Sequence, residues 1–266
     1  MNRLKDKVAI VTGSTSGIGI GIARLFAAEG AHVVVCGRRE AKGQAVVDRI
    51  TAEGGKASYH FLDLTDMSTI EKLINDTVET YGKLDILVNN AANVGLPDGR
   101  VDEVTLEMWD AIFASDLRGT FYAIRCALPH MQKNGGGSII NIGSMASCGG
   151  DLGATAYASA KAGVDMLTRS VALQYGKENI RCNCVRPGLI VTPENDAYVS
   201  QTVKDIFLSN IMVNRYGCPE DIGHACVYFA ADESYFVTGQ ILTVDGGMNF
   251  HAPTVAQFRE AGSRTW

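Results

Sequence analysis

The sequence lacks the features that mark membrane, secreted and disulfide-bonded proteins. No apolar run approaches the length of a transmembrane helix, and the N-terminal "MNRLKDKVAIV" passes from charged residues into an apolar strand without a signal-peptide core. The 7 cysteines include no CxxC pair, and their odd number argues against a complete set of disulfides. These absences predict a soluble cytoplasmic protein with free thiols and no membrane partner.

The charge pattern excludes a second class of protein. The formal net charge is −5, and Lys and Arg form no long basic run, so we expect no nucleic-acid partner. Cys182 and Cys184 would share a face of a strand, but no further ligands stand at zinc-binding spacing. We therefore expect no metal site.

Short apolar runs alternate with longer amphipathic ones along the whole chain. Most of these runs are continuous, as in strands buried on both faces of a parallel sheet, and they cover residues 7–13, 32–37, 56–62, 84–90, 137–143, 180–188 and 240–247. No linker or repeat interrupts the alternation. We expect one domain over residues 1–249, with residues 250–266 as its C-terminal tail.

The segments between these runs have the length and pattern of helices. Residues 17–30, 39–54 and 66–82 each end at Gly, which readily adopts the left-handed conformation that follows a helix. Alternating strands and helices predict an α/β fold with a Rossmann-type, doubly wound parallel sheet of about seven strands and helices on both faces.

A glycine-rich turn follows the first predicted strand. In "VTGSTSGIG", Gly13, Gly17 and Gly19 stand where the strand gives way to a helix, and side chains there would keep a pyrophosphate from the free N–H groups of the helix. The spacing is GxxxGxG and not the commoner GxGxxG. The position favours a dinucleotide site, although a glycine turn with a purely structural role has the same composition.

The second predicted strand ends at Gly37, followed by Arg38 and Arg39. NAD-binding sheets often carry an acidic residue here for the ribose hydroxyls. A glycine leaves room and arginine suits a phosphate, so the pattern favours NADP over NAD as the cofactor. Two solvated arginines at the start of a helix are the alternative.

Four motifs in order, "TGSTSGIG", "NNAA", "YASAK" and "RPG", resemble those of the short-chain dehydrogenase/reductase family. The segment "GCPEDIGHACVYFAADESYFVTGQILTVDGG" is similar to the usual C-terminal signature of that family. The resemblance runs from about residue 4 to residue 249. It implies a nicotinamide-dependent oxidoreductase that interconverts an alcohol and a ketone.

The resemblance assigns the catalytic roles. Tyr157 would be the general acid/base, and Lys161 would bind the nicotinamide ribose and favour the ionised tyrosine. Ser144 would donate a hydrogen bond to the substrate oxygen as charge develops on it. Tyr157 and Lys161 are four residues apart, so a helix would bring both to one face, but ordinary surface pairs share that spacing.

Further positions would contact the cofactor if the resemblance holds. Asp63 would meet the adenine amino group, although an acid in "DLTD" could equally cap a helix or form a turn. Ala92 replaces the glycine usual in the family. The predicted contacts are Gly13, Ser14, Ser16, Gly17, Ile18, Gly19, Arg38, Arg39, Asp63, Leu64, Asn90, Ala91, Tyr157, Lys161, Pro187, Gly188, Ile190 and Thr192.

One position departs from the family pattern in the catalytic set. In "IFASDLRGTF" the family usually has Asn before the Leu, where it helps to hold a water beside the lysine, and this chain has Asp116. If the backbone carbonyl holds the water, Asp116 serves as well. If the side chain contributes, its carboxylate would partly cancel the charge of Lys161. An acid that merely lies near a lysine is the third reading.

The substrate-facing segments would be residues 93–100, 145–154 and 189–215, beyond the carboxyl ends of the strands. Their apolar members predict a small-molecule substrate with an apolar body, and these are Met145, Leu152, Leu189, Tyr198, Phe207 and Met212. Similarity to bacterial hydroxysteroid dehydrogenases favours a steroid or bile acid. A sugar alcohol or a 3-oxoacyl group stays open as the substrate. A catalytically weakened dinucleotide-binding protein stays open as the alternative to an enzyme.

The resemblance also implies a homotetramer, because members of the family are commonly tetramers. The tail, residues 250–266, extends beyond the usual end of the family. It would close over the substrate pocket, cross to a neighbouring subunit or be disordered.

Overall fold

The computed structural model describes residues 2–92, 97–196 and 199–262. Its centre is a seven-stranded sheet of order β3-β2-β1-β4-β5-β6-β7 in which all neighbouring strands are parallel. The strands are β1 Val8–Thr12, β2 His32–Gly37, β3 Lys56–Phe61, β4 Ile86–Asn89, β5 Gly137–Ile142, β6 Ile180–Pro187 and β7 Ile241–Val244. The Rossmann-type α/β fold expected from the sequence is confirmed.

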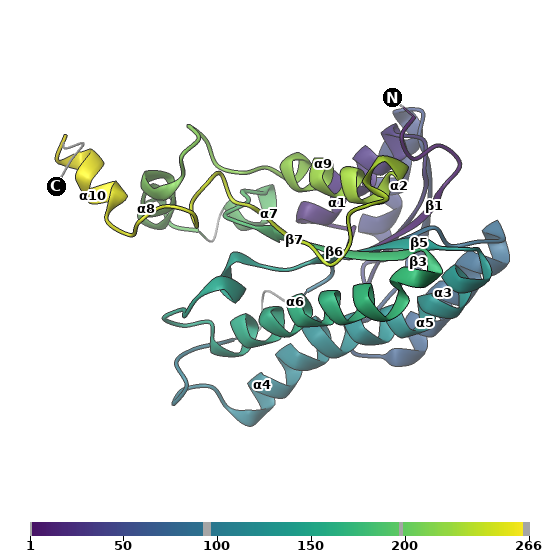
Figure 1. The fold of residues 1–266 in the computed structure, drawn as a ribbon, viewed down its shortest axis with the longest axis horizontal. Coiled ribbons are helices and arrows are strands. Elements are labelled where there is room, and N and C mark those ends of the chain that lie inside the picture. Colours follow the sequence, from purple (N-terminus) through teal and green to yellow (C-terminus); the bar gives the residue numbers. More distant parts are fainter. Residues whose placement is uncertain (1, 93–96, 197–198, 263–266) are drawn as a thin grey trace.

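The alternation of side chains along each strand explains why helices cover both faces of the sheet. In β1, Ala9 and Val11 pack in one apolar cluster, and Ile10 packs in the other. The first cluster includes residues of α1 (Gly17–Ala28), α2 (Glu40–Ala52) and α9 (Pro219–Ala230); the second includes residues of α3 (Met67–Tyr81), α5 (Gly119–Lys133) and α6 (Thr155–Tyr175). Figure 1 shows these two layers on opposite sides of the strands.

The seven apolar runs all form strands, and their ends differ from the predicted ones by at most two or three residues. Central β1 and β4 are buried along their whole length, whereas the edge strands β3 and β7 are partly exposed. The helix ends also follow the sequence. Gly30, Gly54 and Gly82 have φ of 93°, 84° and 77°, so each glycine adopts the left-handed conformation expected after a helix.

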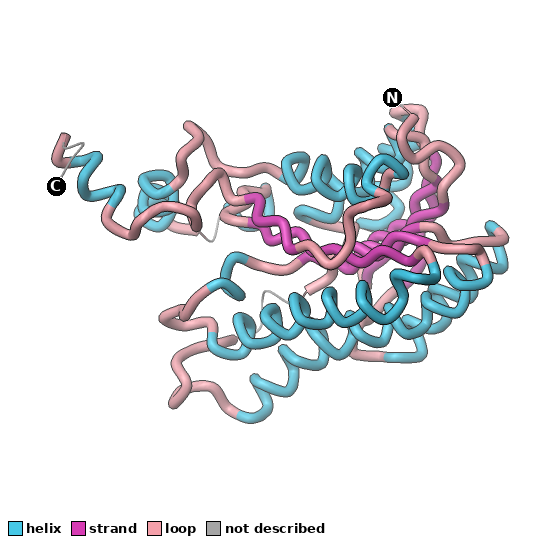
Figure 2. The backbone as a smooth tube through the Cα atoms, in the orientation of Figure 1, coloured by secondary structure: helices cyan, strands magenta, loops and turns pink. Residues whose placement is uncertain are grey.

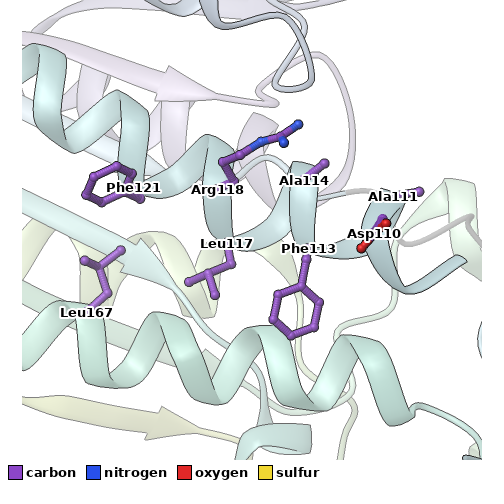
Figure 3. Close-up of a pocket in the computed structure, with 8 residues that line it drawn as sticks. All are labelled: Asp110, Ala111, Phe113, Ala114, Leu117, Arg118, Phe121 and Leu167. Carbon is purple, nitrogen blue, oxygen red and sulfur yellow. The ribbon is translucent and has the colours of Figure 1, made fainter. Parts of the chain in front are cut away.

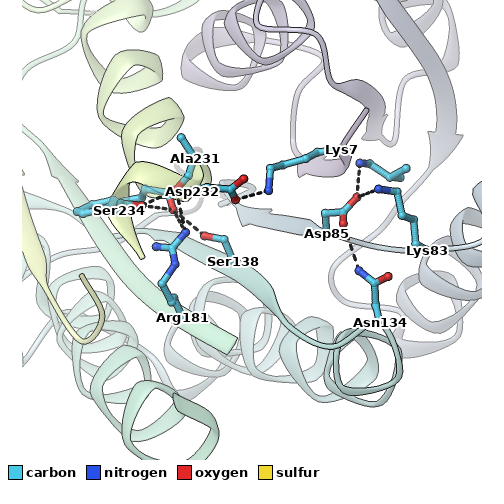
Figure 4. Close-up of polar contacts among 11 residues, drawn as sticks. Lys7, Lys83, Asp85, Asn134, Ser138, Arg181, Ala231, Asp232 and Ser234 are labelled. Carbon is cyan, nitrogen blue, oxygen red and sulfur yellow. Dashed lines mark hydrogen bonds and ion pairs between the residues drawn. The ribbon is translucent and has the colours of Figure 1, made fainter. Parts of the chain in front are cut away.

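Polar contacts join the segments at the amino ends of the strands, and the residues that make them do not belong to the predicted site. Asp85, just before β4, accepts hydrogen bonds from the backbone N of Val8 (2.7 Å) and from Asn134 Nδ2 (3.1 Å). Arg181, at the start of β6, donates to the carbonyl of Phe229 (2.6 Å). Figure 4 shows both groups of contacts. The carboxyl ends of the strands, at the opposite edge, carry the predicted motifs.

Shorter elements complete the fold at both ends of the strands. They are α4 (Leu106–Phe113), a π-helical turn η1 (Ala114–Arg118), 3-10 turns η2 (Met145–Cys148), η3 (Gly176–Glu178) and η4 (Asp232–Ser234), and helices α7 (Pro193–Asp196), α8 (Gln201–Asn210) and α10 (Val255–Glu260). Figures 1 and 2 show α8 and α10 together at the end of the molecule away from the N-terminus. Within the part of the chain that the structure describes, no helix is long and apolar enough to cross a membrane.

Candidate active site

The predicted site residues meet at the carboxyl edge of the sheet, as expected for an open parallel α/β sheet. The glycine loop follows β1, Asn90 follows β4, Ser144 follows β5, and Pro187 ends β6. Since these four strands are neighbours, segments more than 170 residues apart in the chain come together.

The glycine loop packs closely against the segment after β4. A Cβ on Gly13 would lie 2.7 Å from the Cα of Ala91, and a Cβ on Gly19 would lie 2.5 Å from the carbonyl oxygen of Gly13. Both distances are shorter than real Cβ contacts, so any larger residue would force the two loops apart. Gly13 and Gly17 also have positive φ, 65° and 55°, which disfavours other residues.

Asn90 and Thr12 lock the same two loops by hydrogen bonds. The Thr12 hydroxyl accepts from the backbone N atoms of Asn90 and Ala91, both at 2.9 Å, and Asn90 Nδ2 donates to the Thr12 carbonyl at 2.8 Å. The buried Ser14 hydroxyl donates to the carbonyl of Val11 and accepts from the backbone N of Cys36. The side chains of Asn90 and Ser14 therefore hold the loop in place, a role that the motif alone did not reveal.

The end of β2 has the form expected of a phosphate site. A Cβ on Gly37 would lie 2.9 Å from Thr15 Cγ2, so the glycine allows the first loop to approach β2. Arg38 and Arg39 follow it and are both exposed. Arg39 stands immediately before α2 and lies at its N-cap position. Two exposed arginines thus follow β2 directly.

The lysine of the "YASAK" motif is held in a buried position beside the tyrosine. Both residues lie on α6, and Lys161 Nζ is 5.6 Å from the centroid of the Tyr157 ring. Lys161 is only 3% exposed, and its Nζ donates to the carbonyl of Ile142 at 3.1 Å. Burial of an ammonium group is costly unless such partners are present. The surface-pair alternative is therefore wrong for this lysine.

Ser144 stands two residues after β5 and is also buried. It lies at the N-cap of η2, where its Oγ accepts a hydrogen bond from the backbone N of Ala146 at 3.1 Å. That bond uses the oxygen as an acceptor and orients the hydroxyl group, which can still donate its hydrogen to another oxygen.

Asp116 reaches the buried lysine with its side chain. It lies in the π-helical turn η1, is 1% exposed, and its Oδ2 is 4.0 Å from Lys161 Nζ. The Ser115 hydroxyl donates to its Oδ1 at 2.6 Å, and its carbonyl accepts from the Thr120 hydroxyl at 3.0 Å. Of the three readings of Asp116, the geometry favours the one in which the carboxylate affects the charge of Lys161.

Asp63 forms a turn beyond β3. Its Oδ1 accepts from the backbone N and the hydroxyl of Thr65, at 2.9 and 2.8 Å, which is the turn role allowed by the sequence. The N-cap of α3 is Asp66 instead, whose side chain accepts from the backbone N of Ser68. Leu64 lies beside Asp63 and packs against the core. An adenine contact from Asp63 stays a prediction.

The turn after β6 folds back toward the glycine loop. A Cβ on Gly188 would lie 2.7 Å from the Cα of Asp245, so glycine is required where this turn passes the end of β7. Thr192 is buried, and its Cγ2 would lie 3.9 Å from a Cβ placed on Gly17, an ordinary van der Waals contact. Ile190 is buried as well.

A partly buried ion pair that the motifs did not predict supports this turn. Arg186, just before Pro187, donates through Nε and Nη2 to Asp165 Oδ2 at 3.1 and 2.6 Å, and its Nη1 contacts Cys148 Sγ at 3.2 Å. It thereby joins β6, α6 and the segment after Ser144. Asp165 stands one turn beyond Lys161, but no spacing in the sequence pairs it with Arg186.

Cys182 and Cys184 are buried structural thiols. Cys182 accepts a hydrogen bond from Asn141 Nδ2, and Cys184 contacts Asp165. Burial raises the pKa of both thiols, so they are protonated at neutral pH.

The substrate-side segments are partly described. Leu152 is 96% exposed, whereas Met145, Leu189, Phe207 and Met212 are half-buried; Tyr198 and residues 93–96 lie outside the described residues. The tail is ordered into α10, which packs on α8: Arg259 Nη1 donates to the carbonyl of Ser209, and His251 Nε2 contacts the carbonyl of Asn210 at 2.7 Å. The tail therefore braces the segment expected to face the substrate.

These features fit a dinucleotide. The glycine loop packs closely at Gly13 and Gly19 and opens α1, whose first backbone N–H groups suit a pyrophosphate.

Comparison with known proteins agrees with this geometry. A family model described as enoyl-(acyl carrier protein) reductase matches residues 13–249. The 7alpha-hydroxysteroid dehydrogenase of Clostridium sardiniense is 38% identical over 260 residues, which are 97% of this chain and 99% of that protein. The 3-oxoacyl-(acyl-carrier-protein) reductase of Thermotoga maritima is 36% identical over 246 residues, 92% of this chain and 99% of that protein.

A solved structure of a 7 alpha-hydroxysteroid dehydrogenase, complexed with NADH and 7-oxo glycochenodeoxycholic acid, superposes with a TM-score of 0.88. The two sequences are 35% identical, and the match covers 92% of this chain and 96% of the chain in that structure. The chain thus belongs to the short-chain dehydrogenase/reductase family and is an NAD(P)-dependent oxidoreductase acting on CH–OH groups.

Proposed function

We propose that this enzyme interconverts a secondary alcohol and a ketone on a hydroxysteroid or bile acid, with NADP(H) as its preferred cofactor and Tyr157 as its general acid/base. The observation that carries the catalytic assignment is the buried Lys161 ammonium 5.6 Å from the Tyr157 ring centroid. A cation in that position stabilises the phenolate, which is the form that accepts a proton from an alcohol.

Each side chain then has a defined part in the reaction. The bound nicotinamide accepts or supplies the hydride. Tyr157 takes the hydroxyl proton during alcohol oxidation and returns it during ketone reduction. Ser144 donates a hydrogen bond to the substrate oxygen as negative charge develops there. Lys161 is fixed beside Tyr157 by the Ile142 carbonyl and binds the nicotinamide ribose.

The steroid assignment is supported by the 7alpha-hydroxysteroid dehydrogenases, which match nearly the whole chain. The substrate side also favours an apolar molecule. The basic side chains of residues 189–215 form ion pairs with carboxylates of this chain: Lys204 pairs with Asp196, and Arg215 pairs with Asp221. Reduction of a 3-oxoacyl group is the second candidate, supported by the 36% identity to the Thermotoga maritima reductase.

Turnover of a substrate panel tests the proposed reaction. We expect NADPH oxidation, followed at 340 nm, with keto-steroids and 7-oxo bile acids, and a lower kcat/KM with 3-oxoacyl thioesters and sugar ketones. Tyr157→Phe removes the acid/base group and should lower kcat by about 10²- to 10⁴-fold. Equal turnover by Tyr157→Phe and wild type would contradict the mechanism, and a preference for the thioester would replace the steroid with the second candidate.

The NADP preference is supported by Gly37, Arg38 and Arg39 at the end of β2. No carboxylate follows the strand directly, and the two exposed guanidinium groups are suited to a 2′-phosphate. The related structure that holds NADH shows that the fold also accommodates the cofactor without this phosphate.

Arg38→Ala tests the cofactor preference. Loss of one charge-assisted contact should raise the KM for NADPH about tenfold or more and leave the KM for NADH within about twofold. Arg49→Ala removes an exposed arginine from helix α2, which begins two residues after Arg38, and should change neither value. Equal effects of Arg38→Ala on the two cofactors would contradict a role at the 2′-phosphate.

We also propose that Asp116 moderates the charge that Lys161 offers to Tyr157. The two charged groups are 4.0 Å apart and both are buried, so solvent screens their interaction little. A carboxylate there stabilises the buried ammonium and at the same time weakens its effect on the phenolate.

Asp116→Asn should keep the enzyme active and move the pH optimum for alcohol oxidation to lower pH. Removal of the negative charge leaves a stronger net cation beside Tyr157, which favours the phenolate at lower pH. The pH profile of kcat measures the shift, with Asp110→Asn, an exposed change on α4, as the control. An unchanged profile would mean that the Asp116 side chain does not act on the catalytic pair.

A homotetramer is proposed from the family and from an apolar face on α5 and α6. Phe121, Met166 and Leu173 are 47%, 58% and 85% exposed. A hollow of about 830 Å³ is lined by Phe121 and by residues of α4, η1 and α6. Figure 3 shows Phe113 of α4 and Leu117 of η1 pointing toward the helix that carries Leu167. The residues that line this hollow include none of the proposed catalytic residues, so it suits packing between copies of the chain.

Light scattering after gel filtration tests the assembly. The wild type should have about four times the chain mass, 28.5 kDa, and Phe121→Asp should yield a smaller species because it places a charge in the apolar face. Val203→Asp changes a partly exposed apolar residue on α8 and should keep the wild-type mass. A monomeric wild type would contradict the proposal.

A further inference from the structure

Helix α6, which carries Tyr157 and Lys161, begins without a cap from its own sequence. Ala154 occupies the N-cap position and makes no side-chain cap hydrogen bond. The first backbone N–H groups of a helix have no partner within it, and Ser, Thr, Asp or Asn usually supplies one. Tyr157 is the third residue of this helix, so its own N–H is among these groups.

Asp98 supplies the missing acceptors from a distant part of the chain. Its Oδ1 accepts from the backbone N of Ala156 at 3.1 Å, and its Oδ2 accepts from the backbone N of Tyr157 at 2.9 Å. The next residue adds a third contact, because the carbonyl of Gly99 accepts from the Thr155 hydroxyl at 2.7 Å. One carboxylate thus holds the first turn of the helix with both oxygens.

The segment that carries Asp98 is itself held in place. Asp98 Oδ1 accepts from the backbone N of Gly99 at 2.9 Å, and Glu103 Oε2 accepts from the backbone N of Arg100 at 3.0 Å. The chain then enters α4, where Trp109 and Phe113 pack in the same apolar cluster as Tyr157. One continuous segment therefore caps the helix of Tyr157 and contributes to the apolar cluster on which the tyrosine packs.

We propose that Asp98 is a positioning residue for Tyr157, an inference that rests on the acid/base role proposed above. It fixes the first turn of α6, and with it the direction of the phenol group. Its negative charge also offsets the positive end of the helix, which would otherwise favour the phenolate. Asp98 and Lys161 thus act on Tyr157 with opposite sign, one from the start of the helix and one from the next turn.

Hydrogen exchange tests the cap without reference to activity. In the full-length enzyme with NADPH, mass spectrometry of peptides covering residues 155–158 should show about ten- to hundredfold faster exchange in Asp98→Ala, because two amides lose a charged acceptor. Asp102→Asn is the matched control: it lies on the same segment, is exposed, and pairs with Arg100. Unchanged exchange in Asp98→Ala would overturn the cap.

Kinetics test the positioning role with the alcohol that the wild type oxidises fastest. Asp98→Ala should lower kcat about tenfold or more and change the KM for NADP less than twofold, because the cofactor loops are untouched. Asp98→Asn keeps one acceptor oxygen and should retain more of kcat, while the acid limb of its pH profile moves to lower pH. Faster exchange with kcat and pH profile equal to those of Asp102→Asn would overturn the positioning role.

Tyr157→Phe is measured in parallel to separate the two proposals. If it turned over as fast as wild type, the proposed function would fail, whereas the exchange data would still decide whether Asp98 caps α6.

Discussion

The burial of the Lys161 ammonium is the constraint on which the site depends. A cation that is 3% exposed needs partners at fixed places, and the chain provides a hydrogen-bond acceptor, the Ile142 carbonyl from β5, and an ion-pair partner at 4.0 Å, the Asp116 carboxylate from η1. These partners come from elements on different sides of α6. The sheet, the π-helical turn and α6 must therefore all be correctly placed before the buried Lys161 ammonium group is stable. The charge beside Tyr157 thus depends on correct folding.

The same logic applies at the cofactor end, where the constraint is space. The glycine loop and the segment after β4 approach so closely that Gly13 and Gly19 have no room for a Cβ, and Thr12 and Asn90 join the two by hydrogen bonds. The loop is thus rigid before any ligand binds, which reduces the entropy lost on binding. Ser14, buried and bonded to β1 and β2, contributes to this rigidity.

Sequence alone predicts the sheet, the two helical layers and the meeting of the motifs, because strand burial and glycine conformations are local properties. The contacts of Asp98 and Arg186 could not be predicted in the same way. Asp98 caps a helix that begins 57 residues later, and Arg186 pairs with Asp165 across two elements. Because Ala154 cannot cap α6, the sequence does indicate that a hydrogen-bond acceptor must come from elsewhere. It does not identify the segment that supplies this acceptor. The sequence likewise identifies Asp116 as unusual without showing that its side chain reaches Lys161.

Asp116 bears on whether the chain is a weakened enzyme or an active one with a different charge balance. A carboxylate 4.0 Å from the ammonium lowers the net charge beside Tyr157, which by itself disfavours the phenolate. The same carboxylate lowers the cost of burying Lys161, and it is oriented by the Ser115 hydroxyl, so the arrangement is built and not accidental. Ser144, Tyr157 and Lys161 are all in place around it. Under the acid/base role proposed for Tyr157, three charged groups act on it, those of Lys161, Asp116 and Asp98, instead of the lysine alone.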